Sequence, residues 1–402
     1  MTSPLSDRFR ISVLRVSATL AVLVALVWVA PRLYSAPGGK IPVSLFEVVH
    51  SRVVVHNPGV NGYYEQLFGE EGNPMFLGEA EFQRLSKRAR DRVFVQRSRH
   101  GAPEFVYDAS FRIYRFRPNL HDFRDASQPQ GLTTNSYGIL GQDFPIAKPP
   151  HTRRIALLGD SLTQGWGNDQ NKSYGRLLEN RLNASDQTLH YEVLNLAVPA
   201  YDLTQMLDVA VEDTPRYQPD MYLLALTELA VSRTWNEHLI RLIQAGADLK
   251  YDFLREIARD ARASSDDDSL TLMDKLGPYR MKLIHGTLSA IKSHAGAEHI
   301  PFVVALVPSL EDGGMSQNRL NDMPAELAAL KIPTIDLQNT FDAFADMEQF
   351  RVNPTDVHPN TRGHQMLCDN LYAGFRARPD LWATPASVAA RNAARPPARK
   401  SS

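Results

Sequence analysis

The chain of 402 residues contains a single cysteine, Cys368, so it forms no disulfide within itself and no zinc site built from cysteines. An unpaired cysteine usually behaves as a small buried hydrophobe, and we expect that here. The chain also lacks a basic excess: its formal net charge is −1. Without a cationic surplus to displace phosphate counterions, nucleic acid is not expected as a main partner. The sequence shows no internal repeat, and its 43% hydrophobic content is enough for a substantial core.

One long apolar run is present near the amino terminus, at residues 11–31 (ISVLRVSATLAVLVALVWVAP). About twenty such residues span a bilayer as a helix. Three arginines, the last of them Arg15, precede or open the run, and this bias favours a cytoplasmic amino terminus. The small-x-small pattern of a cleavage site is poor, so we expect an uncleaved anchor in the inner membrane with the rest of the chain periplasmic. A cleaved signal peptide and a buried helix are the alternatives.

From Arg153 onward the sequence alternates apolar stretches with helical patterns, and residues 203–217 are one stretch that we expect to form a helix. Five stretches read as strands, at residues 154–160, 191–198, 221–226, 301–307 and 334–337. Near-continuous apolar strands between helices predict an α/β fold with a parallel sheet covered on both faces. We divide the chain into four parts. A stub with a transmembrane anchor occupies residues 1–35, and a linker with an amino-terminal region of unassigned fold occupies residues 36–130. The main domain occupies residues 131–382, with a helical insertion at 231–299, and a disordered tail follows at residues 383–402.

Chemistry-bearing residues follow the expected strands. Ser161 comes directly after the first strand, and Asp356 and His358 lie in a late loop. In an open α/β sheet, ligands bind outside the carboxyl ends of the strands. A histidine that takes the serine proton and an aspartate that orients the imidazole complete a nucleophilic triad. Asp356 and His358 are two residues apart, so in an extended segment they point to one side.

Other uses of these residues fit less well. The G-x-S-x-G elbow fails because Thr163 stands where the second glycine belongs, and GDSLTQGWG lacks the lysine of a phosphate-binding loop. Asp356, His358 and His364 are candidate metal ligands, but His364 falls a turn or more into the next helix. We therefore expect neither a metal nor a cofactor.

Three motifs together carry a family resemblance. LLGDSLTQGWG, NLAVPAY and DVHPNTRGH, preceded by TNSYGILGQDF, resemble the SGNH (GDSL) hydrolase family over residues 133–377. The resemblance implies a flavodoxin-like three-layer α/β/α sandwich and activity as an esterase, acetylesterase or lipase. It also implies Ser161 as nucleophile and as a backbone donor to the oxyanion hole, His358 as general base, and Asp356 as its partner. The family spacing is D-x-x-H, whereas this chain has D-x-H.

Two further departures concern the oxyanion hole. Ala200 occupies the place of a family glycine whose N–H faces the oxyanion, and we expect this donor to survive only if φ of Ala200 is negative. The family's third-motif asparagine is missing, and Thr227 and Glu228 stand nearby. An ionised Glu228 would repel an oxyanion, so Thr227 is the expected donor, through its hydroxyl. The site is therefore either rebuilt or weakened.

Several other residues receive an expected role. Asp160 is expected to stabilise the turn or the helix start, and His364 to be structural. Asn195 is a candidate for bonding between strand-end loops. For three aromatic side chains, a place in the substrate cleft and a place in the core are equally compatible: Trp166, Tyr201 and Trp235.

The sequence thus predicts a membrane-anchored serine esterase that acts on an O-acyl group of a cell-envelope glycan or lipid. This choice of substrate rests on the expected location of the protein and on the activities that are usual in the family that it resembles. An O-acyltransferase with the same triad, and a degenerate domain that binds envelope polysaccharide, remain as alternatives.

Overall fold

The computed structural model of this chain describes residues 104–107, 110–125, 128–310, 320–344, 346–353 and 356–382. They belong to one compact unit, Gly62–Ser402. The other unit, Met1–Asn61, lies outside the described residues, and so do the predicted transmembrane segment and the predicted tail. Among the described residues, no helix is both long and apolar enough to cross a membrane.

The centre of the fold is a five-stranded sheet in which every neighbouring pair of strands is parallel. Across the sheet the strand order is β4-β3-β5-β6-β7. In chain order this is 2-1-3-4-5, the order of flavodoxin-like doubly wound folds. The parallel α/β fold expected from the sequence is therefore confirmed. Its strands are β3 (Thr152–Leu158), β4 (His190–Asn195), β5 (Met221–Leu226), β6 (Phe302–Leu306) and β7 (Thr334–Asp336).

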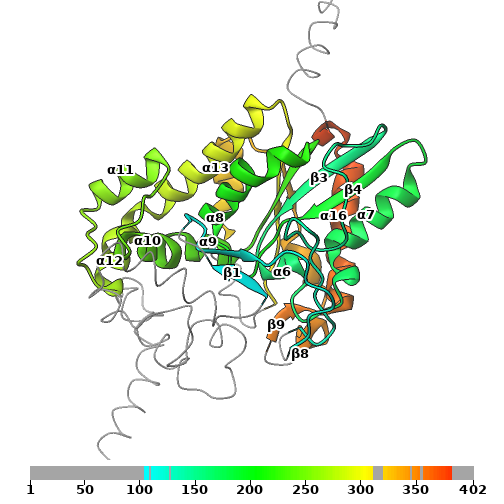
Figure 1. Cartoon of the computed structure of the whole chain (residues 1–402), viewed down its shortest axis with the longest axis horizontal. Coiled ribbons are helices and arrows are strands. Elements are labelled where there is room, and N and C mark those ends of the chain that lie inside the picture. The colour runs from blue at the N-terminus through cyan, green and yellow to red at the C-terminus, as the bar shows by residue number, and fades with distance from the viewer. Residues whose placement is uncertain are drawn as a thin grey trace, which may run out of the picture. The chain divides into compact units, whose positions relative to one another are not determined.

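Helices cover both faces of this sheet (Figure 1). On one face α7 (Tyr174–Ser185) and α16 (Thr361–Ala377) pack against each other, against β4 and against β7. On the other face α8 (Leu203–Asp208) and α13 (Arg280–Ala297) contact each other, and α13 contacts β6. The layers are thus helix, sheet and helix.

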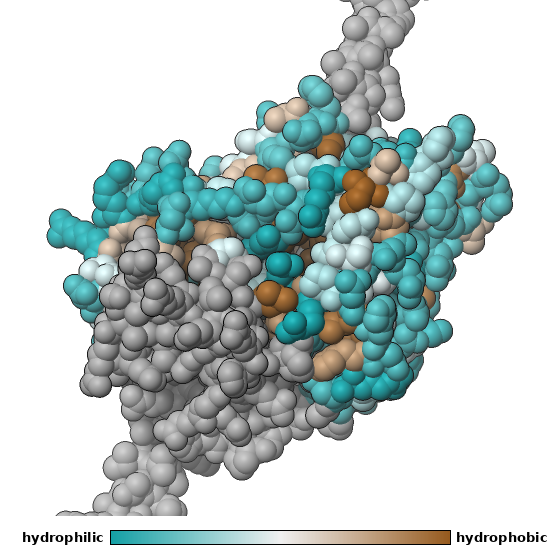
Figure 2. Space-filling view, viewed as in Figure 1, coloured by the Kyte–Doolittle hydropathy of each residue, from teal (hydrophilic) through white to brown (hydrophobic). Residues whose placement is uncertain are grey.

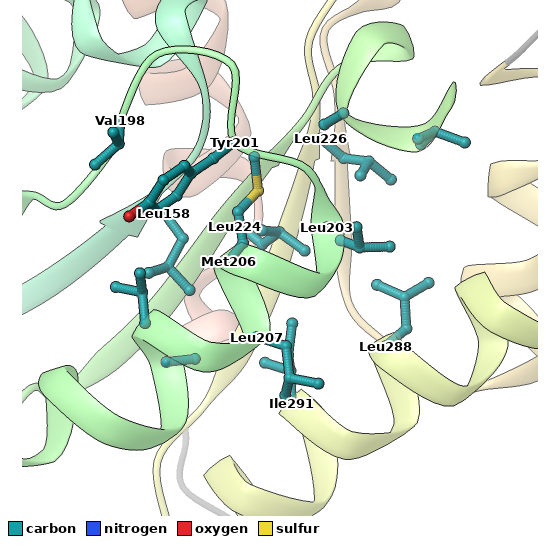
Figure 3. Packing of buried hydrophobic residues seen from close by; sticks show 14 of the residues in the cluster. Leu158, Val198, Tyr201, Leu203, Met206, Leu207, Leu224, Leu226, Leu288 and Ile291 are labelled. Carbon is teal, nitrogen blue, oxygen red and sulfur yellow. The ribbon is translucent and has the colours of Figure 1, made fainter. Parts of the chain in front are cut away.

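Alternation along the strands explains why they are apolar throughout. In β3, Ile155 and Leu157 belong to the core cluster under α7 and α16, whereas Ala156 and Leu158 belong to the cluster under α8 and α13. Figure 3 shows the second cluster, where side chains of β3 and β5 meet those of α8 and α13. Both faces of the sheet are covered, so the central residues of β3 are apolar on each face, whereas the buried Arg154 nearer its start is satisfied by hydrogen bonds to Glu192 and to backbone carbonyls.

One predicted helix is broken. Residues 203–217 form α8, then a π-helical turn η2 (Val209–Asp213) and a 3₁₀ turn η3 (Thr214–Tyr217). Pro215 has no N–H to donate and its ring crowds the preceding turn, so the regular α-helical bonding does not continue through it.

Between β5 and β6 the chain is helical. Its helices are α9 (Glu228–Arg233), η4 (Thr234–His238), α10 (Leu239–Gln244), α11 (Asp252–Asp260), α12 (Ser269–Leu276), η5 (Gly277–Tyr279) and α13. Ile284, Leu288 and Ile291 of α13 are buried as their spacing predicts, and Met281 is half-buried. The surface over α11 is hydrophilic (Figure 2).

Two small hairpins flank the sheet. β1 (Phe105–Tyr107) pairs with β2 (Tyr114–Phe116), and β8 (Arg351–Asn353) pairs with β9 (Asp356–Pro359). The remaining elements are α6 (Ser161–Gln164), η1 (Gln170–Lys172), α15 (Met323–Ala329), η6 (Gln338–Phe341), η7 (Glu348–Phe350) and η8 (Pro379–Trp382).

Candidate active site

The end of β3 and the short helix after it carry Ser161. Asp160 caps α6, because its side chain accepts a hydrogen bond from the Leu162 N–H at 3.0 Å. Gly159 is required in front of it, since a Cβ there would lie 2.2 Å from Oγ1 of Thr163. Ser161 is therefore presented, fully buried, as the first residue of α6 at the carboxyl edge of the sheet.

The hairpin of β8 and β9 carries Asp356 and His358. Residues two apart on a strand share a face. Their side chains meet, with His358 Nδ1 2.5 Å from Asp356 Oδ1, and the His358 backbone N–H also donates to that oxygen at 3.0 Å. Asn360 then caps α16 by accepting from the N–H groups of Arg362 and Gly363, which ends the hairpin.

These two regions, 197 residues apart in sequence, join through one hydrogen bond. His358 Nε2 lies 2.7 Å from Ser161 Oγ. α6 and β9 are in contact in the fold (Figure 1). The structure thus brings all three expected triad residues into one continuous chain of hydrogen bonds, with the D-x-H spacing accommodated.

The donors and acceptors in this chain follow from the charge of Asp356. Burial raises the pKa of Asp356, but hydrogen bonding to the His358 ring, the charge of that ring and the bond from the His358 N–H outweigh burial and hold the pKa below its usual value. Because a carboxylate only accepts, Nδ1–H donates to Asp356. Nε2 of the neutral ring therefore accepts the hydroxyl proton of Ser161.

Ala200 lies in a tight turn after β4. The Tyr201 N–H donates to the Val198 carbonyl at 3.2 Å, with Pro199 second and Ala200 third in the turn. The φ of Ala200 is +61°, so the condition of a negative φ, on which survival of this donor was expected to depend, is not met. Proline suits the second position of such a turn because its ring fixes φ near the value that this position needs.

The same turn lies beside the nucleophile. The Val198 N–H donates to the Gly159 carbonyl at 3.3 Å. Within the described part of the chain, no acceptor takes the Ala200 N–H. This N–H therefore remains a candidate donor to an oxyanion, despite the alanine.

Thr227 has another role than the one expected. It caps α9: its hydroxyl donates to Asp160 Oδ2 at 2.5 Å and accepts from the Ala230 N–H at 3.1 Å. Its single proton is therefore used, and Thr227 is not available as an oxyanion donor. Burial raises the pKa of Asp160, against the opposing effects of the Thr227 hydrogen bond and the charge of Arg233.

Asn195 and His364 both bond within the scaffold around α6. Asn195 Nδ2 donates to the Thr163 carbonyl at 2.9 Å, and its Oδ1 accepts from the Ala197 N–H. His364 is buried and its Nδ1 accepts from the Tyr174 N–H at 3.3 Å. Burial, with the nearby charge of His358, lowers the pKa of His364 to about 3, so the ring is neutral.

The remaining predicted residues lie in the core. The buried Trp166 ring lies 6.1 Å from the His358 ring, centroid to centroid. Tyr201 is buried in the cluster under α8, and the partly buried Trp235 packs against that cluster. Cys368 is buried, and burial raises the pKa of its thiol to about 11. No group of three or more potential metal ligands occurs in the part of the chain that the structure describes.

Two features of the site were not predicted from the sequence, the left-handed conformation of Ala200 and the hydrogen bond of Thr227 to Asp160. Pro199 marks a turn, but it does not mark Ala200 as left-handed, because proline at the second position occurs in turns with either sign of φ at the third residue. No local signal marks Thr227 as the partner of Asp160, because the two residues are 67 positions apart.

The fold and the hydrogen-bonded set of Ser161, His358 and Asp356 together have the make-up of an α/β serine hydrolase. Residues 157–366, just over half of the chain, match the GDSL-like lipase/acylhydrolase family, and the chain belongs to that family. The family resemblance found in the motifs is thereby confirmed. A comparison with curated proteins finds no match.

Solved structures of several esterases resemble part of this chain. The alpha/beta hydrolase LAE5 from the metagenome of Lake Arreo, Spain, has a TM-score of 0.39 at 14% identity, over 55% of this chain and 94% of LAE5. The acetylxylan esterase Axe2 from Geobacillus stearothermophilus has a TM-score of 0.37 at 13% identity, over 55% of this chain and 93% of Axe2. A two-domain esterase active on acetylated mannans, co-crystallized with mannopentaose, has a TM-score of 0.36 at 13% identity, over 56% of this chain and 49% of that esterase. Likenesses of this size carry no inference about what this chain acts on.

Proposed function

We propose that this chain is a serine ester hydrolase with Ser161 as nucleophile, His358 as general base and acid, and Asp356 as the residue that orients and stabilises the imidazole. The proposal rests above all on one observation, the unbroken chain of hydrogen bonds from Asp356 through His358 to Ser161 Oγ. Membership of the acylhydrolase family supports it.

The reaction takes place in two halves. Ser161 Oγ attacks the ester carbonyl carbon while its proton passes to His358 Nε2, and the carboxylate of Asp356 stabilises the imidazolium. Collapse of the tetrahedral intermediate breaks the bond to the alcohol oxygen, which takes the proton from Nε2. Water then attacks the acyl-serine with His358 again as base, releasing the carboxylic acid and restoring Ser161.

Two backbone donors are assigned to the developing oxyanion, the N–H groups of Ser161 and Ala200. Thr227 is not among them, because its proton goes to Asp160. Loss of one donor from an oxyanion hole typically lowers turnover by about 10²–10³. We therefore expect slow turnover unless substrate binding brings in a further donor.

Labelling with a fluorophosphonate probe tests this proposal. The folded wild-type chain is expected to react, and Ser161→Ala is expected to lose the reaction entirely. A folded wild-type protein that does not react removes the hydrolase and the acyltransferase together, leaving the binding module. If the chain reacts, acetate release with and without an added glycan acceptor separates hydrolysis from transfer.

We further propose that the substrate is an O-acyl, for example O-acetyl, group of a cell-envelope glycan or lipid. The chain would act there from the periplasmic side, anchored in the inner membrane by residues 11–31. The support is the apolar run and the arginines before it. An alkaline phosphatase fusion after residue 40 is expected to be active, and an expressed but inactive fusion overturns this orientation.

A further inference from the structure

A second feature next to the candidate active site is an open cavity of about 550 Å³. It is bordered by the loop after α6, by β8 of the small hairpin and by the start of α16. Val352 is its single apolar side chain. Its hydrogen-bonding side chains come from three separate parts of the chain and include Gln130, Asn168, Asp169, Lys172, Thr361 and Arg362.

The cavity and the triad share their supporting elements. Gly167 on the cavity wall follows Trp166, whose ring lies 6.1 Å from the His358 ring. The wall is tight at this point, since a Cβ on Gly167 would lie 2.9 Å from Val352 Cγ1. Val352 belongs to β8, the strand that pairs with β9 and therefore with the segment carrying His358. A group bound in the cavity would lie next to the catalytic loop.

The polar lining has unused bonding capacity. Asn168 is buried, and its Oδ1 accepts from the Thr361 hydroxyl at 2.8 Å, while its Nδ2 has no acceptor among the described residues. Among the described residues, the Asp169 carboxylate accepts only from the Asn171 N–H, at 2.9 Å. Such amide and carboxylate groups bond the hydroxyls of a sugar, and a lining with one apolar side chain does not suit a lipid acyl chain.

The charge of the cavity is positive on balance. Within the described residues, neither Lys172 nor Arg362 forms an ion pair, and Asp169 is the cavity's single carboxylate. Arg362 is held in place, because its guanidinium stacks over the Phe350 ring at 4.8 Å and donates to Gln349 Oε1 at 2.7 Å. Its other N–H groups are left for a carboxylate, which a planar guanidinium binds well. The end of α16 itself is not the anion site, because Asn360 already caps it.

We propose that this cavity binds an acidic sugar unit of the substrate, with the sugar carboxylate at Arg362 and Lys172 and its hydroxyls at Asn168 and Asp169. This inference rests on the proposed ester hydrolase function and narrows its substrate from a glycan or lipid to a glycan that contains uronic acid.

Binding of unacylated sugars tests the cavity apart from the chemistry. The full-length Ser161→Ala chain is titrated with trigalacturonate and with neutral xylotriose by calorimetry. Trigalacturonate is expected to bind at least tenfold more tightly than xylotriose. Equal binding of the two, or no binding of trigalacturonate by the folded chain, overturns the proposal.

Charge-removing variants locate the binding. Lys172→Gln and Arg362→Gln are each expected to weaken trigalacturonate binding about tenfold, since each removes one charge-assisted contact. The side chain of Lys172 is exposed and forms no hydrogen bond or ion pair with a described residue, so its variant is expected to fold. Arg376→Gln, at the other end of α16, is the matched control and is expected to bind as before. Trigalacturonate binding unaffected by both cavity variants contradicts the assignment.

Kinetics distinguish the two possible failures. In the wild-type chain, kcat/KM is measured with 4-nitrophenyl acetate and with acetylated oligogalacturonate. The ratio of kcat/KM for oligogalacturonate to kcat/KM for the small ester is expected to be about tenfold lower in Arg362→Gln than in the wild-type chain. Hydrolysis of the small ester without discrimination by Arg362 overturns the cavity alone. Trigalacturonate binding without any ester hydrolysis overturns the enzyme and leaves the sugar site.

Discussion

The residue that departs most informatively from its family is Ala200. It is held at φ +61° by a turn that contains Pro199, although an L-residue with a side chain resists this region by about 1–2 kcal/mol. The chain therefore keeps the backbone conformation at the cost of strain, and its N–H stays free of acceptors within the described residues. A glycine at this position would remove the strain without moving the donor.

At this scale we predict that Ala200→Gly raises the free energy of unfolding by up to about 1 kcal/mol, because relief of the left-handed strain outweighs the lost methyl group. Fluorophosphonate labelling of Ser161 is expected to proceed at least as fast as in wild type. Chemical denaturation and labelling rates are the measurements.

The matched control is Ala197→Gly, three residues earlier. Ala197 is buried and does not have a positive φ, so glycine there is expected to destabilise the chain by about 1 kcal/mol. If both variants lose stability to the same extent, strain at Ala200 is not the explanation of its conformation.

At the scale of elements, the position of Ser161 depends on how closely α6 approaches the end of β3. Thr163 of α6 lies over Gly159, and its hydroxyl accepts from Tyr174 Oη at 2.8 Å, so it has little room to move. The glycine is thus needed for a close approach of strand and helix, and its φ is not positive.

We predict that Gly159→Ala lowers the free energy of unfolding by about 1–3 kcal/mol through overpacking. Displacement of α6 is expected to slow fluorophosphonate labelling at least tenfold in the protein that remains folded. Gly296→Ala in α13 is the control, because a Cβ there meets nothing within 4 Å and alanine favours the helix. Labelling at the wild-type rate in folded Gly159→Ala would show that α6 does not need this glycine.

At the scale of the whole unit, a buried polar group ties three regions together. His238 of the insertion donates from Nε2 to the Phe111 carbonyl at 2.7 Å, its Nδ1 lies 2.8 Å from the Thr204 hydroxyl, and that hydroxyl lies 2.8 Å from Asp202 Oδ1. Burial raises the pKa of Asp202 to about 7, whereas burial lowers the pKa of His238 to about 4. The folded chain is therefore most stable when the Asp202 carboxyl and the His238 ring are both neutral.

The sign of the pH effect follows from proton binding. Between its ordinary value near 4 and about 7, Asp202 holds a proton in the folded chain but not in the unfolded chain, so its stabilising contribution is lost as pH rises through about 7. We predict that Asp202→Asn flattens the pH dependence by up to about 1.4 kcal/mol per pH unit over that window. Denaturation of both proteins between pH 5 and 8 checks this, and parallel curves would show that Asp202 does not titrate there.

Most of the architecture was predictable from local pattern. Strands such as β5 are apolar at every position because each face of the sheet is buried, and this double burial is visible in the sequence. Ser161 after a strand, and Asp356 two residues before His358, were predictable for the same reason, since strand ends and strand faces follow from spacing. The helix expected at 203–217 is regular only as far as Asp208, and a π-helical turn and a 3₁₀ turn that contains Pro215 follow it.

The sequence by itself determined the parallel sheet, because periodicity acts between near neighbours, and its motif resemblance indicated the three residues of the hydrogen-bonded set. Only the tertiary structure decided that Thr227 donates to Asp160, that Ala200 is left-handed and that Lys172 and Arg362 line one cavity. Each of these depends on which distant segments meet. A hydroxyl, a turn or a lysine takes its role from the partner that folding brings to it.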